Sequence, residues 1–264
     1  MTTKMKTSIT PRGEAAALYP AKGLFGFVVM LAAALLAVAT LFFAAEGGAR
    51  AQTLPLNGKI VVIDPGHGGS DLGATYTFPD RSTKLYEKDQ NLDVASKLRY
   101  LLQGQGATVF MTRTDDRALT NTQRAQFANG KQADVLVSIH MNGSTDPKVD
   151  YTTTLFGKWQ KDKAFAYAVF GDNVNTPKIN PPTYGLRTLS AANGMGTIAT
   201  RTPYSYASGV LIKSNMPAII AETVFITNAD EAKLLSNSTG ARQQQIAEAL
   251  KTGVMRYLAP STTN

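Results

Sequence analysis

The sequence predicts an α/β fold, a three-layer α/β/α arrangement in which helices cover both faces of a twisted, largely parallel (mixed) sheet. Short apolar runs rich in β-branched residues alternate with segments of helical periodicity over residues 59–140, in the order β-α-β-α-β. That order favours parallel strands joined by crossover helices. The 213 residues after residue 51 are a usual size for one such domain, and they contain no internal repeat.

The first 51 residues are set apart by composition. Four basic residues precede an uncharged, apolar stretch of 22 residues, 24–45, and the small-x-small sequence Ala-Arg-Ala follows at 49–51. This order predicts a secretory signal peptide, and we favour cleavage before Gln52. The alternative is a membrane anchor through residues 24–45, because about 20 apolar residues suffice to span a bilayer. Either way, residues 52–264 are predicted to be exported across the cytoplasmic membrane, to the periplasm, the cell wall or the extracellular space.

The first predicted strand covers residues 59–64, a short β-branched run. A loop with glycines at 66, 68, 69 and 73 follows. A helix is then predicted from Glu87, because apolar residues recur at helical spacing (Leu92, Ala95, Leu98 and Leu102). Gly104 and Gly106 predict the end of this helix.

Two further strands and a helix complete the first half. The run ATVFMTR, 107–113, predicts the second strand. Thr120, with Gln123 three residues later, has the pattern of a capping box and predicts that a helix begins there. The run DVLVSIH, 134–140, predicts the third strand.

The remainder is less regular until residue 216. Residues 152–159 have a strand pattern, residues 162–174 have a helix pattern, and residues 175–205 are rich in Pro, Gly, Thr and Asn, which predicts a long surface excursion. MPAIIAETVFITN, 216–228, predicts a strand followed by a helix start. The last helix is predicted over residues 241–257, with one apolar face (Ile246, Leu250, Val254 and Tyr257).

Charge and cysteine content exclude some functions. Residues 52–264 carry 22 basic and 17 acidic side chains without a Lys/Arg run, so we expect no nucleic-acid partner. An anionic polymer such as a cell wall fits an exported basic protein better. The chain has no cysteine, so it has neither disulfides nor a thiolate metal site.

Both histidines of the chain follow apolar strand-like runs. His67 closes the sequence KIVVIDPGHGG and His140 closes ADVLVSIHMNG. In open α/β sheets, ligands bind beyond the carboxyl ends of the strands, so parallel strands would bring these histidines to one rim. Glu87 begins the helix after the first loop, and Glu222 ends the apolar run PAIIAE. Two imidazoles and a carboxylate form a ligand set for catalytic zinc, which leaves the other carboxylate as the acid/base.

The residues differ in how strongly they indicate a function. Glu87 alone is weak evidence, because acidic residues in the first turn of a helix are favoured by the helix dipole. Glu222 is stronger, because a carboxylate is costly to bury inside an apolar strand without a task. Asp64 also follows an apolar run, and we expect it to orient a ligand or hold the loop rather than to bind metal.

Five segments carry a resemblance to a known family. The chain resembles the zinc-dependent N-acetylmuramoyl-L-alanine amidases of the type 3 amidase family in IVVIDPGHGGSDLGA, EKDQNLDVASKLRYLL, GATVFMTRTDDRALTNTQRAQFAN, ADVLVSIHMN and MPAIIAETVFITNADEAKLL. Together these segments span most of residues 59–235 in the family's order, and the combination is highly specific.

The resemblance implies that His67, Glu87 and His140 bind Zn²⁺ and that Glu222 is the catalytic carboxylate. The implied reaction is hydrolysis of the amide that joins N-acetylmuramic acid to L-alanine in peptidoglycan, by a catalytic domain over residues 52–264. The family usually has Pro at Leu72 and often Gly at Val224, where a branched side chain could narrow the site or shift Glu222. Some relatives carry an autoinhibitory helix between the second histidine and the glutamate, whereas residues 162–170 indicate an ordinary framework helix.

Two other functions stay open at this point. One is a non-catalytic peptidoglycan-binding or regulatory protein on the same fold, and the other is zinc hydrolysis of a peptide bond or an N-acetyl group. We expect a monomer whose partners are peptidoglycan and, in some settings, a protein activator. The match to the family is loose over residues 142–214, so no substrate contact is assigned there.

Overall fold

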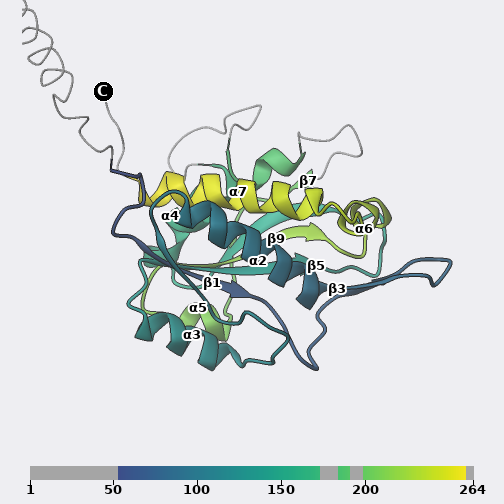
Figure 1. Cartoon of the computed structure of the whole chain (residues 1–264), viewed down its shortest axis with the longest axis horizontal. Coiled ribbons are helices and arrows are strands. Elements are labelled where there is room, and N and C mark those ends of the chain that lie inside the picture. The colour runs from purple at the N-terminus through teal and green to yellow at the C-terminus, as the bar shows by residue number, and fades with distance from the viewer. Residues whose placement is uncertain (1–52, 173–183, 191–198, 260–264) are drawn as a thin grey trace, which may run out of the picture. The chain divides into compact units, whose positions relative to one another are not determined.

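The computed structural model describes residues 53–172, 184–190 and 199–259, which belong to one compact unit, Thr53–Asn264 (Figure 1). At its centre lies a mixed sheet with the strand order β4-β1-β5-β9-β6-β7, in which β8 also pairs with β6. Its strands are β1 (Ile60–Pro65), β4 (Thr108–Met111), β5 (Val135–Asn142), β6 (Tyr151–Phe156), β7 (Ala199–Thr200), β8 (Tyr204–Ser205) and β9 (Ala218–Phe225).

The strands that carry the predicted site residues run in one direction. β4, β1, β5 and β9 run parallel to one another, whereas β6 is antiparallel to β9. The largely parallel, mixed sheet predicted from the sequence is therefore confirmed. The carboxyl ends of β1, β5 and β9 meet at one edge because these strands are adjacent as well as parallel.

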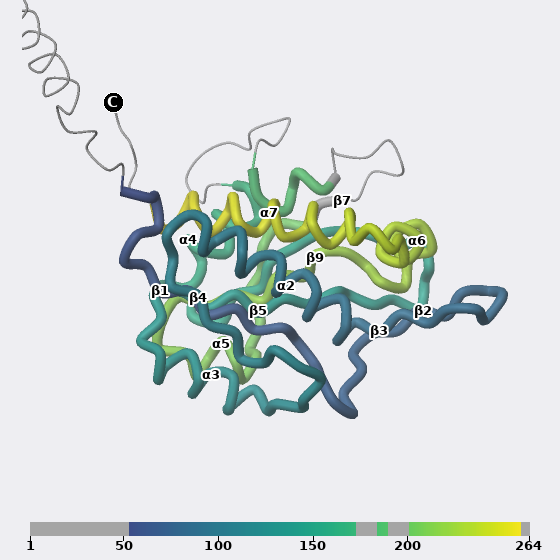
Figure 2. Tube along the Cα trace, in the orientation of Figure 1, coloured from purple at the N-terminus to yellow at the C-terminus, as the bar shows by residue number. Residues whose placement is uncertain are grey.

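Helices cover both faces of the sheet, as Figures 1 and 2 show. One hydrophobic cluster joins a face of the sheet to α2 (Glu87–Gln103), α4 (Trp159–Phe170), α6 (Ala229–Leu235) and α7 (Ala241–Leu258). A smaller cluster joins the other face to α3 (Asn121–Gly130) and α5 (Gly209–Ile212). The three-layer arrangement is thus confirmed.

Local sequence rules account for several element boundaries. The side chain of Thr120 accepts from the backbone N–H of Gln123 and the side chain of Gln123 accepts from the backbone N–H of Thr120, which is the predicted capping box of α3. Asn228 caps α6 by accepting from the backbone N–H groups of residues 230 and 231. The framework helix predicted within residues 162–174 is confirmed as α4, which buries Phe165 and Val169 in the core.

The shortest elements were not predicted. These are the hairpin of β2 (Thr75–Thr77) and β3 (Lys84–Tyr86), the strands β7 and β8, the helix α5, and the 3₁₀ helix Leu186–Ser190. Elements of two to five residues are too short to show a hydrophobic period, so only their tertiary partners define them. β7, β8 and the 3₁₀ helix fall within the predicted surface excursion.

The predicted leader, residues 1–51, lies outside the described residues. Among the residues that the structure describes, no helix is both long and apolar enough to cross a membrane.

Candidate active site

The carboxyl edge of the parallel strands holds all four residues singled out from the sequence. His67 follows β1 by two residues, His140 lies near the end of β5, and Glu222 lies in β9 in register with His140. Glu87 is the first residue of α2. These four residues line one cavity of about 500 Å³. Residues far apart in the sequence are therefore brought together by strand order.

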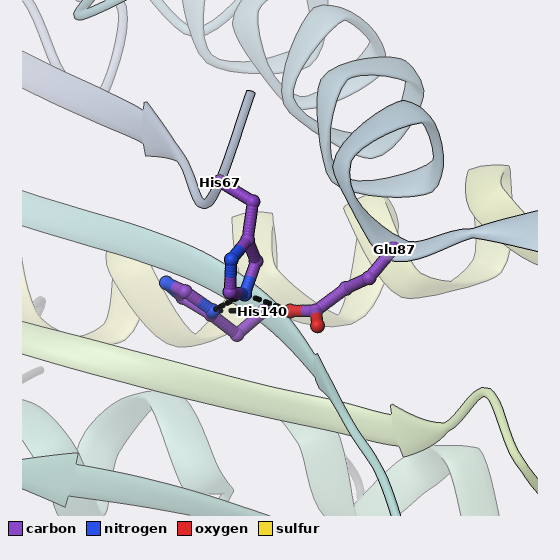
Figure 3. A group of neighbouring side chains, drawn as sticks. All are labelled: His67, Glu87 and His140. Atoms are coloured by element: carbon purple, nitrogen blue, oxygen red, sulfur yellow. Dashed lines mark hydrogen bonds and ion pairs between the residues drawn. The ribbon is translucent and has the colours of Figure 1, made fainter. Parts of the chain in front are cut away.

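Three of them point at a common centre (Figure 3). Nε2 of His67 and Nδ1 of His140 each lie 3.0 Å from Oε1 of Glu87, and the two nitrogens are 3.2 Å apart. Zinc bonds of about 2.0–2.2 Å in tetrahedral geometry place ligand atoms about 3.3 Å from one another. The triangle of donor atoms and its chemistry therefore fit a zinc ion.

Glu87 is held by groups outside the triangle as well. Its Oε2 accepts from the backbone N–H of Ala74 (2.8 Å), and its Oε1 accepts from the backbone N–H of Met141 (3.0 Å) and from Nδ2 of Asn91 (3.2 Å). Burial raises the pKa of Glu87, but hydrogen bonds with His140 and His67 outweigh it, so this pKa lies well below its usual range. Glu87 is therefore an ionised, fixed carboxylate, as a metal ligand must be.

His67 occupies a strained backbone position. Its φ is +60°, in the left-handed region that non-glycine residues rarely adopt. The guanidinium of Arg124 donates to the carbonyl of His67 (2.8 Å) and to that of Pro65 (2.8 Å). Arg124 is itself paired with the buried Asp64 (2.7 Å). These contacts fix the loop that presents the histidine ring.

Asp64 thus holds the loop and contacts neither histidine. Besides pairing with Arg124, it accepts hydrogen bonds from the hydroxyls of Thr112 and Ser138. A second buried guanidinium, that of Arg113, donates to the carbonyls of Pro65 and Gly66. Neither arginine was predicted from the sequence to hold this loop.

Two glycines of the loop lie against side chains of the triangle. A Cβ at Gly66 would lie 2.3 Å from the ring of His140. A Cβ at Gly73, where φ is +66°, would lie 2.4 Å from Oε2 of Glu87. The glycines therefore allow the backbone of this loop to lie close to the triangle of side chains.

Asp71 is a further residue of the site, and it was not predicted from the sequence. Nδ1 of His67 donates to Oδ1 of Asp71 (2.9 Å), which leaves the lone pair of Nε2 directed at the triangle. The side chain is 63% exposed and sits in a polar loop, so it had no pattern of burial or period to distinguish it. Only its spacing of four residues from His67 could have pointed to it.

We expect Asp71→Ala to weaken zinc binding by about 10–100-fold without unfolding the protein, because the carboxylate orients His67 but does not bind metal. Competition with a fluorescent chelator would measure the affinity. Asp116→Ala is the matched control, because Asp116 is an exposed carboxylate that binds the backbone of the same loop at Gly69 and contacts neither histidine. Equal zinc affinity in Asp71→Ala and wild type would contradict the orienting role.

Glu222 lies on the cavity side of β9 and is not part of the triangle. Its Oε2 is shielded from solvent and has no hydrogen-bond partner, although the residue as a whole is partly exposed. Burial raises the pKa of Glu222, and attraction to His140 offsets only part of this rise. An unpartnered carboxylate oxygen in a cavity is free to exchange a proton with a bound molecule.

Val224 does not narrow the cavity. The pairing of β9 with β5 shifts register between Glu222 and Phe225, so that the side-chain alternation is broken there. Val224 is fully buried in the larger hydrophobic cluster, and it is absent from the described lining of the cavity. The narrowing of the site that a branched side chain could cause at this position is therefore not seen.

Comparisons with known proteins agree with this geometry. The family model described as N-acetylmuramoyl-L-alanine amidase matches residues 61–256. The germination-specific N-acetylmuramoyl-L-alanine amidase of Bacillus subtilis is 29% identical over 221 residues, which cover 78% of this chain and 82% of the relative.

Solved structures give the same result. The catalytic domain of CwlV, an N-acetylmuramoyl-L-alanine amidase of Bacillus (Paenibacillus) polymyxa var. colistinus, matches with a TM-score of 0.62 and 29% identity, over 76% of this chain and 98% of that chain. The CwlD amidase of Clostridioides difficile, solved in complex with the GerS lipoprotein, matches with a TM-score of 0.61 and 27% identity, over 76% and 98% of the two chains.

Proposed function

Since the chain belongs to the N-acetylmuramoyl-L-alanine amidase family, we propose that His67, Glu87 and His140 hold a catalytic zinc ion and that Glu222 is its acid/base. The protein is an N-acetylmuramoyl-L-alanine amidase of peptidoglycan. The observation that carries the proposal is the triangle of two histidine nitrogens and one glutamate oxygen, with the free Oε2 of Glu222 in the same cavity.

The chemistry divides between the ion and the side chains. When bound, zinc supplies a Lewis acid that polarises the scissile carbonyl and makes a water molecule acidic enough to react near neutral pH. Glu222 takes a proton from the attacking water and returns it to the departing alanine nitrogen. Asp71 keeps His67 in the tautomer that presents Nε2 to the metal. Arg124 holds the backbone of His67, so that this ligand is fixed before substrate arrives.

The test is digestion of purified peptidoglycan by residues 52–264 with zinc, followed by mass spectrometry of the soluble products. We expect free stem peptides that begin at L-alanine, and we expect a chelator to abolish their release because the triangle needs its metal. Re-addition of zinc should restore the release. Products cut at a peptide bond or at an N-acetyl group would keep the zinc site and change the bond that is assigned.

Export and partners are part of the proposal. The order of basic, apolar and small-x-small residues supports a signal peptide or membrane anchor in residues 1–51 and an exported catalytic domain in residues 52–264. The structural relative CwlD is seen with a lipoprotein, which supports a protein activator for this chain too. Release of stem peptides by the isolated domain would show that such a partner is not obligatory.

A further inference from the structure

A guanidinium without an ionic partner lies beside the cavity. Arg201 is exposed, and within the described part of the chain it forms no ion pair. Its Cζ lies 4.6 Å from the ring centre of Tyr204 and 5.7 Å from that of Tyr151, and its Nη1 donates to the hydroxyl of Tyr151 (3.2 Å). Two aromatic rings thus orient the planar group while its other N–H donors have no described acceptor.

Strand pairing places this group on the same face of the sheet as Glu222. Thr153 pairs with Glu222 across the antiparallel β6–β9 ladder, and Tyr151 shares the face of Thr153 because side chains alternate along a strand. Leu155, on the same face, pairs with Tyr204. Tyr204 also lines the cavity together with Glu222. Arg201 therefore stands at the rim of the proposed active site.

The charges that line the cavity mean that an anionic ligand needs a cation at the rim. Asp71 and Glu222 line the cavity and repel an anionic ligand when they are ionised, whereas a bound zinc ion would offset the charge of Glu87. Arg124 is the one lysine or arginine among the described lining residues, and it is occupied by Asp64 and by the carbonyls of the His67 loop. Arg201, by contrast, is a guanidinium next to the cavity that is available for a carboxylate.

We propose that Arg201, held by Tyr151 and Tyr204, binds a carboxylate on the peptide side of the substrate and so selects acidic over amidated stem peptides. This assignment rests on the proposed function, because the cavity must accept the amide that joins the peptide to the sugar. The planar fork of arginine matches a carboxylate bidentately, and stacking on two rings lowers the entropy lost on binding. The subsite is a determinant of specificity and takes no part in the bond-breaking step.

The test compares two probes, N-acetylmuramoyl-L-alanyl-D-glutamate and the analogue in which both carboxylates are carboxamides. For Arg201→Gln in the zinc-loaded domain, the ratio of kcat/KM for the acid to kcat/KM for the diamide should fall about tenfold, which is the usual loss for a charge-assisted hydrogen bond. For Arg201→Lys, this ratio should lie between the values for wild type and Arg201→Gln, because lysine keeps the positive charge but cannot bind a carboxylate bidentately.

A matched control comes from the helix α2. Arg99 also lies over a tyrosine ring, that of Tyr100 (4.8 Å), and donates to its hydroxyl (3.1 Å). It is 12 residues from Glu87 along the helix, or about 18 Å. Arg99→Gln should leave the acid-to-diamide ratio at its wild-type value.

Binding of the released peptide separates this proposal from the amidase mechanism. Calorimetry should show that L-alanyl-D-glutamate binds Arg201→Gln about tenfold more weakly than it binds wild type, with no such loss for the diamide. Equal weakening for both peptides, or no weakening at all, would overturn the carboxylate subsite. Since binding requires no turnover, it decides the subsite even if the wild-type protein cleaves neither probe, a result that would count against the proposed mechanism alone.

Discussion

Replacing Glu222 with glutamine is expected to lower amide hydrolysis by about a thousandfold while zinc content and fold are unchanged. The size follows from the usual contribution of a positioned general acid/base, about 10²–10⁴-fold. The metal should stay because Glu222 lies outside the triangle of His67, Glu87 and His140. The fold should stay because glutamine has nearly the same shape and Oε2 has no hydrogen bond to lose. Rates of stem-peptide release, metal analysis and thermal melting would measure the three quantities.

Glu248→Gln is the matched control for this variant. Glu248 is an exposed carboxylate on α7 whose described partner is Gln244, so its neutralisation should leave the rate at the wild-type level. Normal turnover by Glu222→Gln would show that another group moves the proton. Loss of zinc from Glu222→Gln would indicate that Glu222 is itself a zinc ligand.

The second large effect is expected for His140→Ala, which should lose both zinc binding and activity. Removal of a ligand should exceed the 10–100-fold loss of affinity expected when an orienting residue is removed. Zinc at 100 times its dissociation constant should stabilise the wild-type domain by about 2.7 kcal/mol and raise its melting temperature. We expect no such rise in His140→Ala at the same zinc concentration. Melting curves with and without zinc, together with metal analysis after dialysis, would test this.

His67→Ala should behave as His140→Ala does, because each ring contributes one nitrogen to the triangle, 3.0 Å from Oε1 of Glu87. Asp116→Ala should keep the zinc-dependent rise, because Asp116 holds the same loop without touching the ligands. Wild-type zinc affinity in His140→Ala would refute the assignment of Nδ1 as a ligand atom.

Most of the site could be foreseen from the sequence because the chain has two histidines and both follow apolar runs. Strand ends are where parallel sheets expose side chains, so the positions of His67, His140 and Glu222 predicted their convergence. Glu87 was the weakest of the four predictions, since a helix dipole alone would explain an acid there. The structure brings its carboxylate to 3.0 Å from both histidines.

The supporting residues could not be foreseen in the same way. Asp71 is exposed, and the buried guanidinium groups of Arg113 and Arg124 donate to backbone carbonyls of the His67 loop. Their partners are mostly backbone carbonyls, which every residue possesses, and Asp64, the carboxylate that pairs with Arg124, lies 60 residues away in the sequence. Arg201 is a similar case, because its stacking depends on the pairing of β7 and β8 with β6.

The face of β9 on which Val224 lies could not be predicted from the sequence. The sequence places a branched residue two positions after Glu222, and regular alternation would put it on the same face. The register shift in β9 turns it to the other face, where it packs in the core. A single extra residue in a ladder is not visible in a pattern of apolar residues, because both faces of this strand are buried.

The sequence by itself determined the α/β class, the order of the main strands and helices, the family, and the four residues of the site. It could do so because burial and turn chemistry impose periods and breaks that are local in the chain. Only the tertiary structure decided the 3.0–3.2 Å triangle of donor atoms, the loop held by Arg113 and Arg124, the contact of Asp71 with His67 and the cation at the rim. These features depend on contacts between residues tens of positions apart, or on the orientation of one side chain toward another. Such contacts leave no periodic pattern in the sequence.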